Sequence, residues 1–331
     1  MTEETWSGVR CTNKAGIICV ICCLSLILAG CSQSIPFAFD PDSDLGQFNI
    51  VTATSSSQVK TFAADICVTE NDHEAMTLAI DEAEAGGLFD ATAAETVYAK
   101  NVHEQLNPAS LTKVMTAYLA LKYGHPEDTL TASPNVVIKE SGAQLLGLKE
   151  GDRMTLDQAL HALLMYSAND AGVLIAEYLC GSVESFASVM NEEAVKLGAT
   201  NTHFTNPHGL TDEDHYTTAY DLYLMFNAAM QYEEFRNIIH TTEYKSTYKD
   251  RDGNPKNIEI GTTNAYIKGD RSAPDGVTVI GGKTGTTKAA KSCLILLSQG
   301  SDEHQYISVI LGSTDRETLY DNMTTLLTDI R

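Results

Sequence analysis

Positive charge is scarce in this chain of 331 residues, because 22 lysines and arginines stand against 44 aspartates and glutamates. The formal net charge at pH 7 is therefore -22. A surface of one negative sign repels the phosphates of nucleic acids and of anionic lipids, so we expect no nucleic-acid partner. Hydrophobic residues make up 43% of the chain and charged residues 20%, a balance that is ordinary for a globular protein and excludes overall disorder.

Two common catalytic signatures are also missing. The chain has no His-Glu-x-x-His motif, which argues against a metallopeptidase, and no Gly-x-Ser-x-Gly motif, which argues against an α/β-hydrolase. His203, His208 and His215 lie within thirteen residues, so a metal site remains an alternative. Asn206-Pro-His-Gly, however, is typical of a turn. We expect neither a metal nor another cofactor.

The apolar run near the N-terminus, Ala15–Ala29, is only fifteen residues long. That is short for a membrane-spanning helix and typical of the hydrophobic region of a signal peptide. Arg10 and Lys14 precede it, and it ends in Leu28-Ala-Gly-Cys31, which is similar to a bacterial lipobox. We expect residues 1–30 to be a lipoprotein signal peptide and Cys31 to carry lipid. A plain cleavage site and an uncleaved anchor are the alternatives.

Few cysteines remain after this signal peptide. If Cys31 carries lipid, three cysteines remain: Cys67, Cys180 and Cys293. Three cysteines cannot all pair with one another, so we expect no disulfide framework. A single bridge between Cys180 and Cys293 is possible, and the sequence does not decide it.

The rest of the chain divides into a tether and a folded domain. Residues 31–65 are rich in Ser, Thr, Asp and Gln, which predicts a flexible tether. In the domain, 66–331, apolar spacing and turn residues predict strands, helices and an acidic hairpin loop. The expected strands are Met76–Ile80, Thr96–Ala99, Thr278–Gly282, Cys293–Leu297 and Tyr306–Leu311, and the loop is 82–95. One expected helix follows Pro108 and ends at Gly124, and a second opens at Thr155 in a capping box with Gln158. A third runs from Glu184 to Leu197 and is stopped by Gly198, and the last spans Glu317–Ile330. This order predicts an α+β fold, in which an antiparallel sheet is flanked by helices and a helical sub-domain is inserted.

Ser-x-x-Lys, a pattern that can pair a nucleophile with an amine base, occurs three times, starting at Ser57, Ser110 and Ser246. Only Ser110 opens an amphipathic helix, where residues i and i+3 share a face and Lys113 can reach the hydroxyl. A helix start also offers free backbone N–H groups to a developing oxyanion. The alternative is that Ser110 is merely an N-cap.

Ser-x-Asn occurs twice. Ser133-Pro-Asn is typical of a turn. Ser167-Ala-Asn169 separates two apolar helical runs, where buried polar groups need partners. A helix corner with Asn169 as a cap is the alternative.

Lys283-Thr-Gly285 occurs once, after a strand that ends in Gly281 and Gly282. Strand glycines permit close approach by a ligand backbone. Lys283 supplies a positive charge, and Thr284 and Thr286 supply donors, a set that suits a carboxylate. The alternative is a basic hairpin turn.

In this order the three motifs resemble those of penicillin-binding proteins and serine β-lactamases. Within that group the chain is most similar to the D-alanyl-D-alanine carboxypeptidases of the peptidase S11 family. The resemblance rests on four segments and covers residues 75–331: Pro108–Thr116, Ser167–Asp170, Asn206–Leu210 and Gly281–Thr287. It implies a DD-peptidase fold for 66–331. The sequence ends soon after the last expected helix, so we expect no C-terminal β-domain, and the loop 82–95 looks longer than in the family.

The resemblance also implies a mechanism. Ser110 would attack the penultimate D-alanine carbonyl of a peptidoglycan stem pentapeptide, neutral Lys113 would take its proton, and Ser167 would relay a proton to the leaving amine. Asn169 would hold the substrate amide and orient Lys113. The backbone N–H groups of Ser110 and Thr286 would form the oxyanion hole. The carboxylate would be bound by the last motif and its neighbours: Lys283, Thr284, Gly285, Thr286 and, unless it is an ordinary surface arginine, Arg316.

The resemblance further implies that β-lactams acylate Ser110. The lipobox-like segment, for its part, predicts that a lipid on Cys31 holds the protein at the extracytoplasmic face of the bacterial cell membrane. A class A β-lactamase also needs a glutamate after the second motif, and residues 199–212 contain none. β-Lactamase and DD-endopeptidase activities remain the alternatives, and transpeptidase side reactions stay open. A binding protein on an inactive enzyme scaffold is disfavoured, because every motif residue is present.

Overall fold

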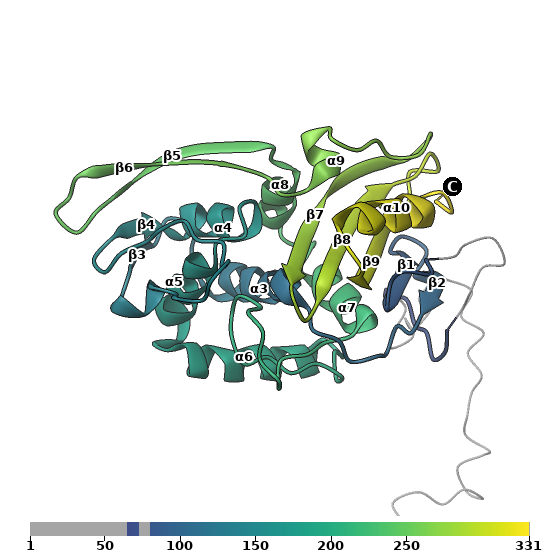
Figure 1. Ribbon diagram of the computed structural model, residues 1–331, viewed down its shortest axis with the longest axis horizontal. Coiled ribbons are helices and arrows are strands. Elements are labelled where there is room, and N and C mark those ends of the chain that lie inside the picture. The colour runs from purple at the N-terminus through teal and green to yellow at the C-terminus, as the bar shows by residue number, and fades with distance from the viewer. Residues whose placement is uncertain (1–64, 73–79, 331) are drawn as a thin grey trace, which may run out of the picture. The chain divides into compact units, whose positions relative to one another are not determined.

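The computed structural model describes residues 65–72 and 80–330, which lie within a compact unit that runs from Lys60 to Arg331 (Figure 1). Its strands are β1 (Ala85–Asp90), β2 (Glu95–Lys100), β3 (Thr129–Thr131), β4 (Arg153–Thr155), β5 (Glu243–Lys249), β6 (Pro255–Gly261), β7 (Thr278–Thr287), β8 (Lys291–Gln299) and β9 (Gln305–Ser313). Its helices are α3 (Lys113–Tyr123), α4 (Leu156–Leu164), α5 (Asn169–Cys180), α6 (Val183–Lys196), α7 (Ala219–Ala229), α8 (Glu233–His240), α9 (Ala265–Lys268) and α10 (Arg316–Leu327), with the 3₁₀ turns η1 (Ala109–Thr112) and η2 (Pro134–Val136).

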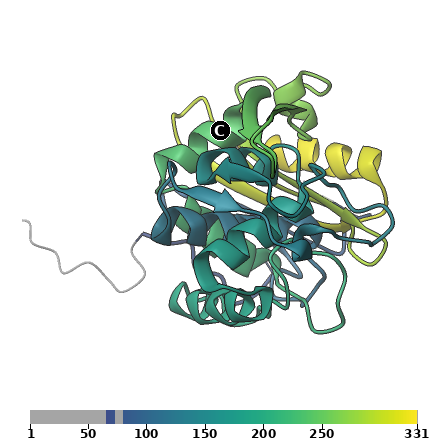
Figure 2. The ribbon, with the colours of Figure 1, turned by 90° about the vertical axis from the view of Figure 1, so that its left-hand side faces the viewer.

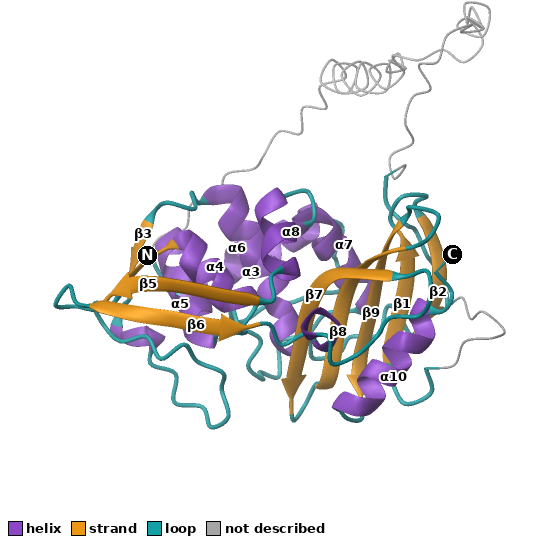
Figure 3. Cartoon of the chain, turned by 90° about the horizontal axis from the view of Figure 1, so that it is seen from above, coloured by secondary structure: helices purple, strands orange, loops and turns teal. Residues whose placement is uncertain are grey.

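The main sheet is antiparallel and has five strands in the order β2-β1-β9-β8-β7. Alternate residues of its strands point to opposite faces. On β9, Ile307, Val309 and Leu311 join the core shared with the helical half, whereas Tyr306 and Ile310 pack with α10. Figure 3 shows α10 on one side of the sheet and α3, α4, α6, α7 and α8 on the other side. Helix α9 packs with α10, because Ala265 and Tyr266 share a core cluster with Tyr320. β7 is an edge strand, so its outer backbone edge is available beside the helical half.

The helical half lies between η1 and β7 in the sequence. It contains α3 to α8 and a four-stranded sheet in the order β3-β4-β5-β6. The hairpin of β5 and β6 runs along the top of this half in Figure 1, and Figure 2 views the half end-on. Helix α3 is buried along most of its length and contacts α4, α5 and α7. It therefore forms the centre of this half, and it begins directly after η1.

The prediction of a loop over 82–95 was wrong for half of its length. Residues Ala85–Asp90 form β1, whose side chains are buried and which pairs with β2 and β9. Gly86 and Gly87 lie in this strand, and a Cβ on Gly86 would lie 2.4 Å from the Ile80 side chain. Tertiary pairing thus overrode a weak local β propensity. The true hairpin turn is the short connection from Asp90 to Glu95.

The other predicted elements agree with the structure within a few residues at most ends, although the strands at 278, 293 and 306 are longer than expected. The Thr155–Gln158 capping box is present at α4, and α6 ends before Gly198, which has a φ of +86°. The α+β fold is confirmed. Several predictions fall outside the described residues: the signal peptide, Cys31, the tether to residue 64 and most of the expected strand Met76–Ile80.

Cys67, Cys180 and Cys293 are all free, so the possible bridge between Cys180 and Cys293 is not formed. Within 65–72 and 80–330, no single helix is long and apolar enough to cross a membrane, and only α5 with α6, bent by 82°, passes that test of length and composition as a pair.

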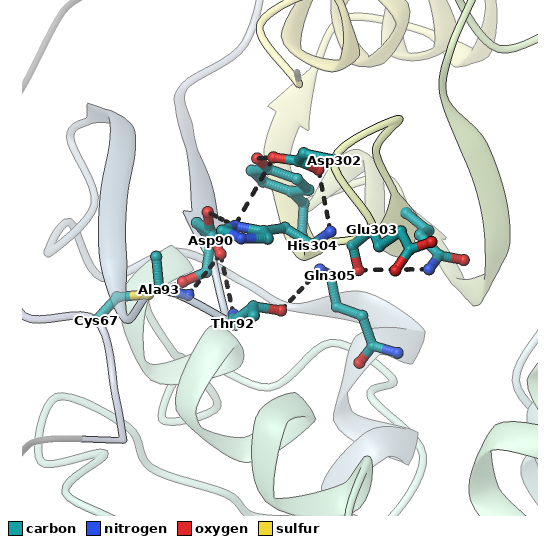
Figure 4. Close-up of polar contacts among 10 residues, drawn as sticks. Cys67, Asp90, Thr92, Ala93, Asp302, Glu303, His304 and Gln305 are labelled. Atoms are coloured by element: carbon teal, nitrogen blue, oxygen red, sulfur yellow. Dashed lines mark hydrogen bonds and ion pairs between the residues drawn. The ribbon is translucent and has the colours of Figure 1, made fainter.

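A polar cluster joins the turn after β1 to the turn before β9 (Figure 4). One carboxylate oxygen of Asp90 accepts from the backbone N–H groups of Thr92 and Ala93 at 2.9 and 2.8 Å. Its other oxygen lies 2.7 Å from Nδ1 of His304. This hydrogen bond raises the pKa of His304 above its ordinary value. The cluster therefore ties together two neighbouring strands at the end of the sheet.

Candidate active site

The nucleophile candidate Ser110 lies in η1, the 3₁₀ turn that leads into α3. Nζ of Lys113 is 2.8 Å from Oγ of Ser110, as the i,i+3 spacing predicts. The N-cap position is Pro108, so the interpretation of Ser110 as a cap is wrong. The expected α-helical start is also corrected to a 3₁₀ turn. Ala109 has a φ of +47°, a backbone strain that is typical of functional sites.

Lys113 is completely buried, and its Nζ has three polar neighbours. They are Oγ of Ser110 at 2.8 Å, Oδ1 of Asn169 at 2.6 Å and the backbone oxygen of His208 at 2.6 Å. Burial, and next the positive charge of Lys283, lower the pKa of Lys113 well below its ordinary value, although Asp170 opposes this. A neutral amine has two protons and one lone pair. Because Ser110 is the one neighbour of the three with a proton to give, the lone pair of neutral Lys113 is directed to its hydroxyl.

Ser167 and Asn169 lie at the junction of α4 and α5, as predicted. Ser167 is buried and has a φ of +66°, which is strained for a residue with a side chain. Asn169 is the first residue of α5, and the N-cap is Ala168 without a side-chain bond. The interpretation of Asn169 as a cap is therefore wrong, and its side-chain oxygen accepts from Lys113 instead.

Lys283 comes from β7 and is also buried. Its Nζ donates to Oγ of Ser167 at 2.9 Å and to the backbone oxygen of Thr284 at 2.7 Å. Burial lowers the pKa of Lys283 to about 7. The hydroxyl of Thr284 is 2.6 Å from the hydroxyl of Thr263. The second motif brings the other two together, because Asn169 bonds to Lys113 of the first motif and Ser167 bonds to Lys283 of the third. The third motif lies in a strand, so its interpretation as a hairpin turn is wrong.

The glycines before Lys283 serve protein packing rather than ligand approach. A Cβ on Gly281 would lie 2.6 Å from the backbone oxygen of Ile239 in α8, and one on Gly282 would lie 2.1 Å from the oxygen of Ile295 in β8. These glycines let α8 and β8 close against β7. The role that we expected for them in contacting a ligand is corrected.

The segment after Asn206 closes the site from a third side. Gly209 has a φ of +84°, and a Cβ there would lie 1.8 Å from the backbone oxygen of Ala109. His215 is buried and His208 is partly buried, and desolvation lowers their pKa values to about 4 and about 3, respectively. His203 bonds instead to the backbone of Asp214. Within the described part of the chain, no group of three or more His, Cys, Asp or Glu side chains could hold a metal.

A cleft of ≈ 540 Å³ opens above these groups. It is lined by Ser110, Ser167, Asn169, Thr284, Gly285 and Thr286 of the motifs and by Arg316. Arg316 is the first residue of α10, and it donates from Nη2 to the backbone oxygen of Thr263 at 2.9 Å. Lys113 and Lys283 lie buried beneath the cleft. All of the predicted site residues within the described part are therefore in one place.

Part of the cleft lining lies outside the residues that the motifs predicted. The missed residues are Glu140, Ser141, Gly142, Ala143, Gln144, Tyr166, Gly209, Leu210, Thr211, Thr263, Thr287 and Lys288. Several of them lie directly beside a motif in the sequence, and that position could have indicated them. Glu140–Gln144, by contrast, belongs to an irregular stretch with neither periodicity nor a motif, so no sequence signal identified it.

Comparison with known proteins agrees with this geometry. A model of the peptidase S11 family, described as D-alanyl-D-alanine carboxypeptidase, matches residues 72–315. The chain belongs to the peptidase S11 family. Its relatives in this family include D-alanyl-D-alanine carboxypeptidase DacF of Bacillus subtilis, 35% identical over 242 residues, which cover 71% of this chain and 59% of DacF. DacD of Escherichia coli is 32% identical over 236 residues, which cover 68% of this chain and 57% of DacD.

This S11 chain therefore spans less than two thirds of the length of these relatives. Among solved structures, the Streptomyces K15 DD-transpeptidase superposes with a TM-score of 0.71 at 25% identity, over 77% of this chain and 98% of that chain. The S11 fold thus accounts for the sheet, the helical half and the cleft between them.

Proposed function

We propose that the protein is a serine-type D-alanyl-D-alanine carboxypeptidase that removes the terminal D-alanine of peptidoglycan stem pentapeptides. The observation that carries this proposal is the buried Lys113, whose amine lies 2.8 Å from the hydroxyl of Ser110 and whose pKa is lowered. A lysine that is neutral at working pH can act as a general base for a serine nucleophile. The S11 membership and the names of the relatives support the substrate class.

In the acylation step, Ser110 Oγ attacks the penultimate D-alanine carbonyl carbon while Lys113 takes the hydroxyl proton. The backbone N–H groups of Ser110 and Thr286 are the proposed oxyanion hole. Gly285 supports this pairing, because a Cβ there would lie 3.1 Å from the Ser110 nitrogen, so β7 approaches η1 closely.

The leaving D-alanine then needs a proton at its amine and a partner for its carboxylate. Ser167 gives its hydroxyl proton to this amine and is reprotonated with the proton that Lys113 took from Ser110. Lys283 donates to Oγ of Ser167, which leaves the hydroxyl proton of Ser167 free to be transferred. The carboxylate is held by Thr284 and Thr286, which line the cleft together with Arg316. Lys283 lies buried beneath them and supplies positive charge. Water then hydrolyses the ester on Ser110 and releases the shortened peptide.

A β-lactam should acylate Ser110 and remain attached, because the 199–212 segment has no glutamate to activate water. Glu140 lines the cleft, but it comes before the second motif and lies on the exposed segment. Rapid turnover of penicillin by the purified protein would instead make β-lactamase the better description.

The test is release of D-alanine from a synthetic pentapeptide, together with mass spectrometry of the penicillin adduct. Ser110→Ala should abolish both the activity and the adduct. Ser246→Ala is a matched control, because Ser246 also starts a Ser-x-x-Lys pattern but lies on β5 and accepts from Gln158. Full activity of Ser110→Ala would overturn the assignment.

Transpeptidation is a second candidate, favoured by the similarity to a protein named DD-transpeptidase. Both reactions share the acyl-enzyme and differ in whether water or an amine attacks it. Adding an amino-acid acceptor to the pentapeptide assay separates them, since a transpeptidase forms the new amide in place of the hydrolysed tetrapeptide.

We also propose that a lipid on Cys31 anchors the protein at the extracytoplasmic face of the membrane. The lipobox-like Leu28–Cys31 supports this, and stable attachment requires more than one acyl chain. Mass spectrometry of the mature N-terminus tests it: a diacylglyceryl mass on Cys31 is expected, and Cys31→Ala should remove that mass and release the protein from membranes.

A further inference from the structure

The exposed wall of the cleft is held by a carboxylate that the proposed mechanism does not use. Residues Glu140–Gln144 line the cleft, and they belong to the irregular connection between η2 and β4. Asp170, the second residue of α5, is 1% exposed. Asp170 follows Asn169, the residue whose side chain accepts from Lys113. The start of α5 therefore positions both side chains.

Both oxygens of Asp170 accept backbone hydrogen bonds. Oδ2 accepts from the N–H groups of Gly147 and Leu148 at 2.8 and 2.9 Å. Oδ1 accepts from Leu146 at 2.9 Å and from Ala171 at 3.1 Å. Three consecutive amides of the connection therefore converge on one buried carboxylate.

The same helix start makes a second attachment to the wall. The backbone N–H of Asn169 donates to the backbone oxygen of Gln144 at 2.8 Å. Asn169 thus binds the wall through its backbone and Lys113 through its side chain. Most side chains of 139–147 are exposed, so these bonds rather than core packing fix the segment.

We propose that Asp170 is a positioning residue that holds Glu140–Gln144 at a fixed distance from the catalytic groups and so sets the affinity for the peptide substrate. The substrate part rests on the proposed carboxypeptidase function. Asp170 does not line the cleft, so it acts through the wall and not by contact with the substrate. A displacement of about 1 Å in such a positioning element can reduce activity about 100-fold.

The test variant is Asp170→Asn, which keeps the shape of the side chain. An amide has one oxygen and one NH₂ group, so in either orientation two of the four backbone N–H groups face a donor instead of an acceptor. We expect KM for a D-Ala-D-Ala pentapeptide to rise about tenfold or more. At a pH where Lys113 is neutral in both proteins, kcat should stay within about threefold, because the charge of Asp170 only opposes the lowering of the Lys113 pKa and its loss leaves the amine neutral.

Asp152→Asn is the matched control. Asp152 is also buried, accepts from the backbone N–H of Lys149 at 3.1 Å and pairs with Lys256, but it does not line the cleft. It should lower the melting temperature without changing KM. If Asp170→Asn changes KM no more than Asp152→Asn does, the role of Asp170 is only structural and the proposal fails.

Hydrogen exchange of the wild type covers the case in which Asp170→Asn does not fold. The amides of Leu146, Gly147 and Leu148 should exchange slowly, since each donates to a buried acceptor. Exchange at the rate of an unstructured peptide would overturn the proposal. Failure of the wild type to release D-alanine would overturn the carboxypeptidase function instead, so the two failures are distinct.

Discussion

Replacing Lys283 by methionine should change how the stability of the protein depends on pH. Burial lowers the pKa of Lys283 from the ordinary 10.5 to about 7 in the folded protein. In the unfolded chain the amine returns to its ordinary pKa, so between these two values the unfolded chain binds more protons than the folded one. Stability therefore rises with pH across this window.

The magnitude follows from the size of the shift. At about 1.4 kcal/mol per pKa unit, the full shift corresponds to about 5 kcal/mol. Between pH 7 and about 9.5, the linkage relation gives a rise of about 3 kcal/mol from Lys283 alone. Tyrosines that ionise in the unfolded chain contribute equally to wild type and variant, so they cancel in the difference between the two. Lys283→Met abolishes this contribution. The same variant also loses bonds to Ser167 and Thr284, so the slope with pH, rather than the stability at one pH, isolates the charge.

The assay is guanidinium unfolding followed by circular dichroism at several pH values. The stability of the wild type relative to Lys283→Met should increase by about 3 kcal/mol from pH 7 to about pH 9.5. Lys245→Met is the control: Lys245 is exposed, and its contact with Glu259 raises its pKa, so this variant should show no such increase. A flat difference for Lys283→Met would refute the lowered pKa of Lys283.

Three further outcomes follow from the structure. Gly209→Ala should destabilise the protein by more than about 1 kcal/mol and impair acylation, because φ is +84° there and the new Cβ would overlap the backbone oxygen of Ala109; thermal unfolding and the penicillin labelling rate check this. His304→Gln should cost most stability below about pH 6.5, where wild-type His304 is charged beside Asp90, and the gap should close as pH rises through the raised pKa of the folded state; unfolding at several pH values measures it. Thr155→Ala should cost about 1 kcal/mol by removing the N-cap of α4, with unchanged penicillin labelling.

The sequence was sufficient where local spacing determines geometry. The i,i+3 relation predicted the contact of Ser110 with Lys113, and turn and cap residues predicted where α4 and α6 begin or end. It failed for β1, because that strand is stabilised by its neighbours β2 and β9 and not by its own propensity. The Glu140–Gln144 wall could not be predicted either, since it is placed by long-range bonds to residues 169 and 170.

The site combines groups that are individually unfavourable, which argues that the arrangement is specified by the whole fold. Two lysines are buried, and each has a lowered pKa. Ala109 and Ser167 adopt positive φ angles, which cost free energy for residues with a side chain. Each cost is offset by a different element, because α5 supplies the acceptor of Lys113, Gly209 makes room for the backbone of Ala109, and β7 binds Ser167. A change in one element should therefore disturb the other motifs, and functional effects of substitutions at these positions should be strongly non-additive.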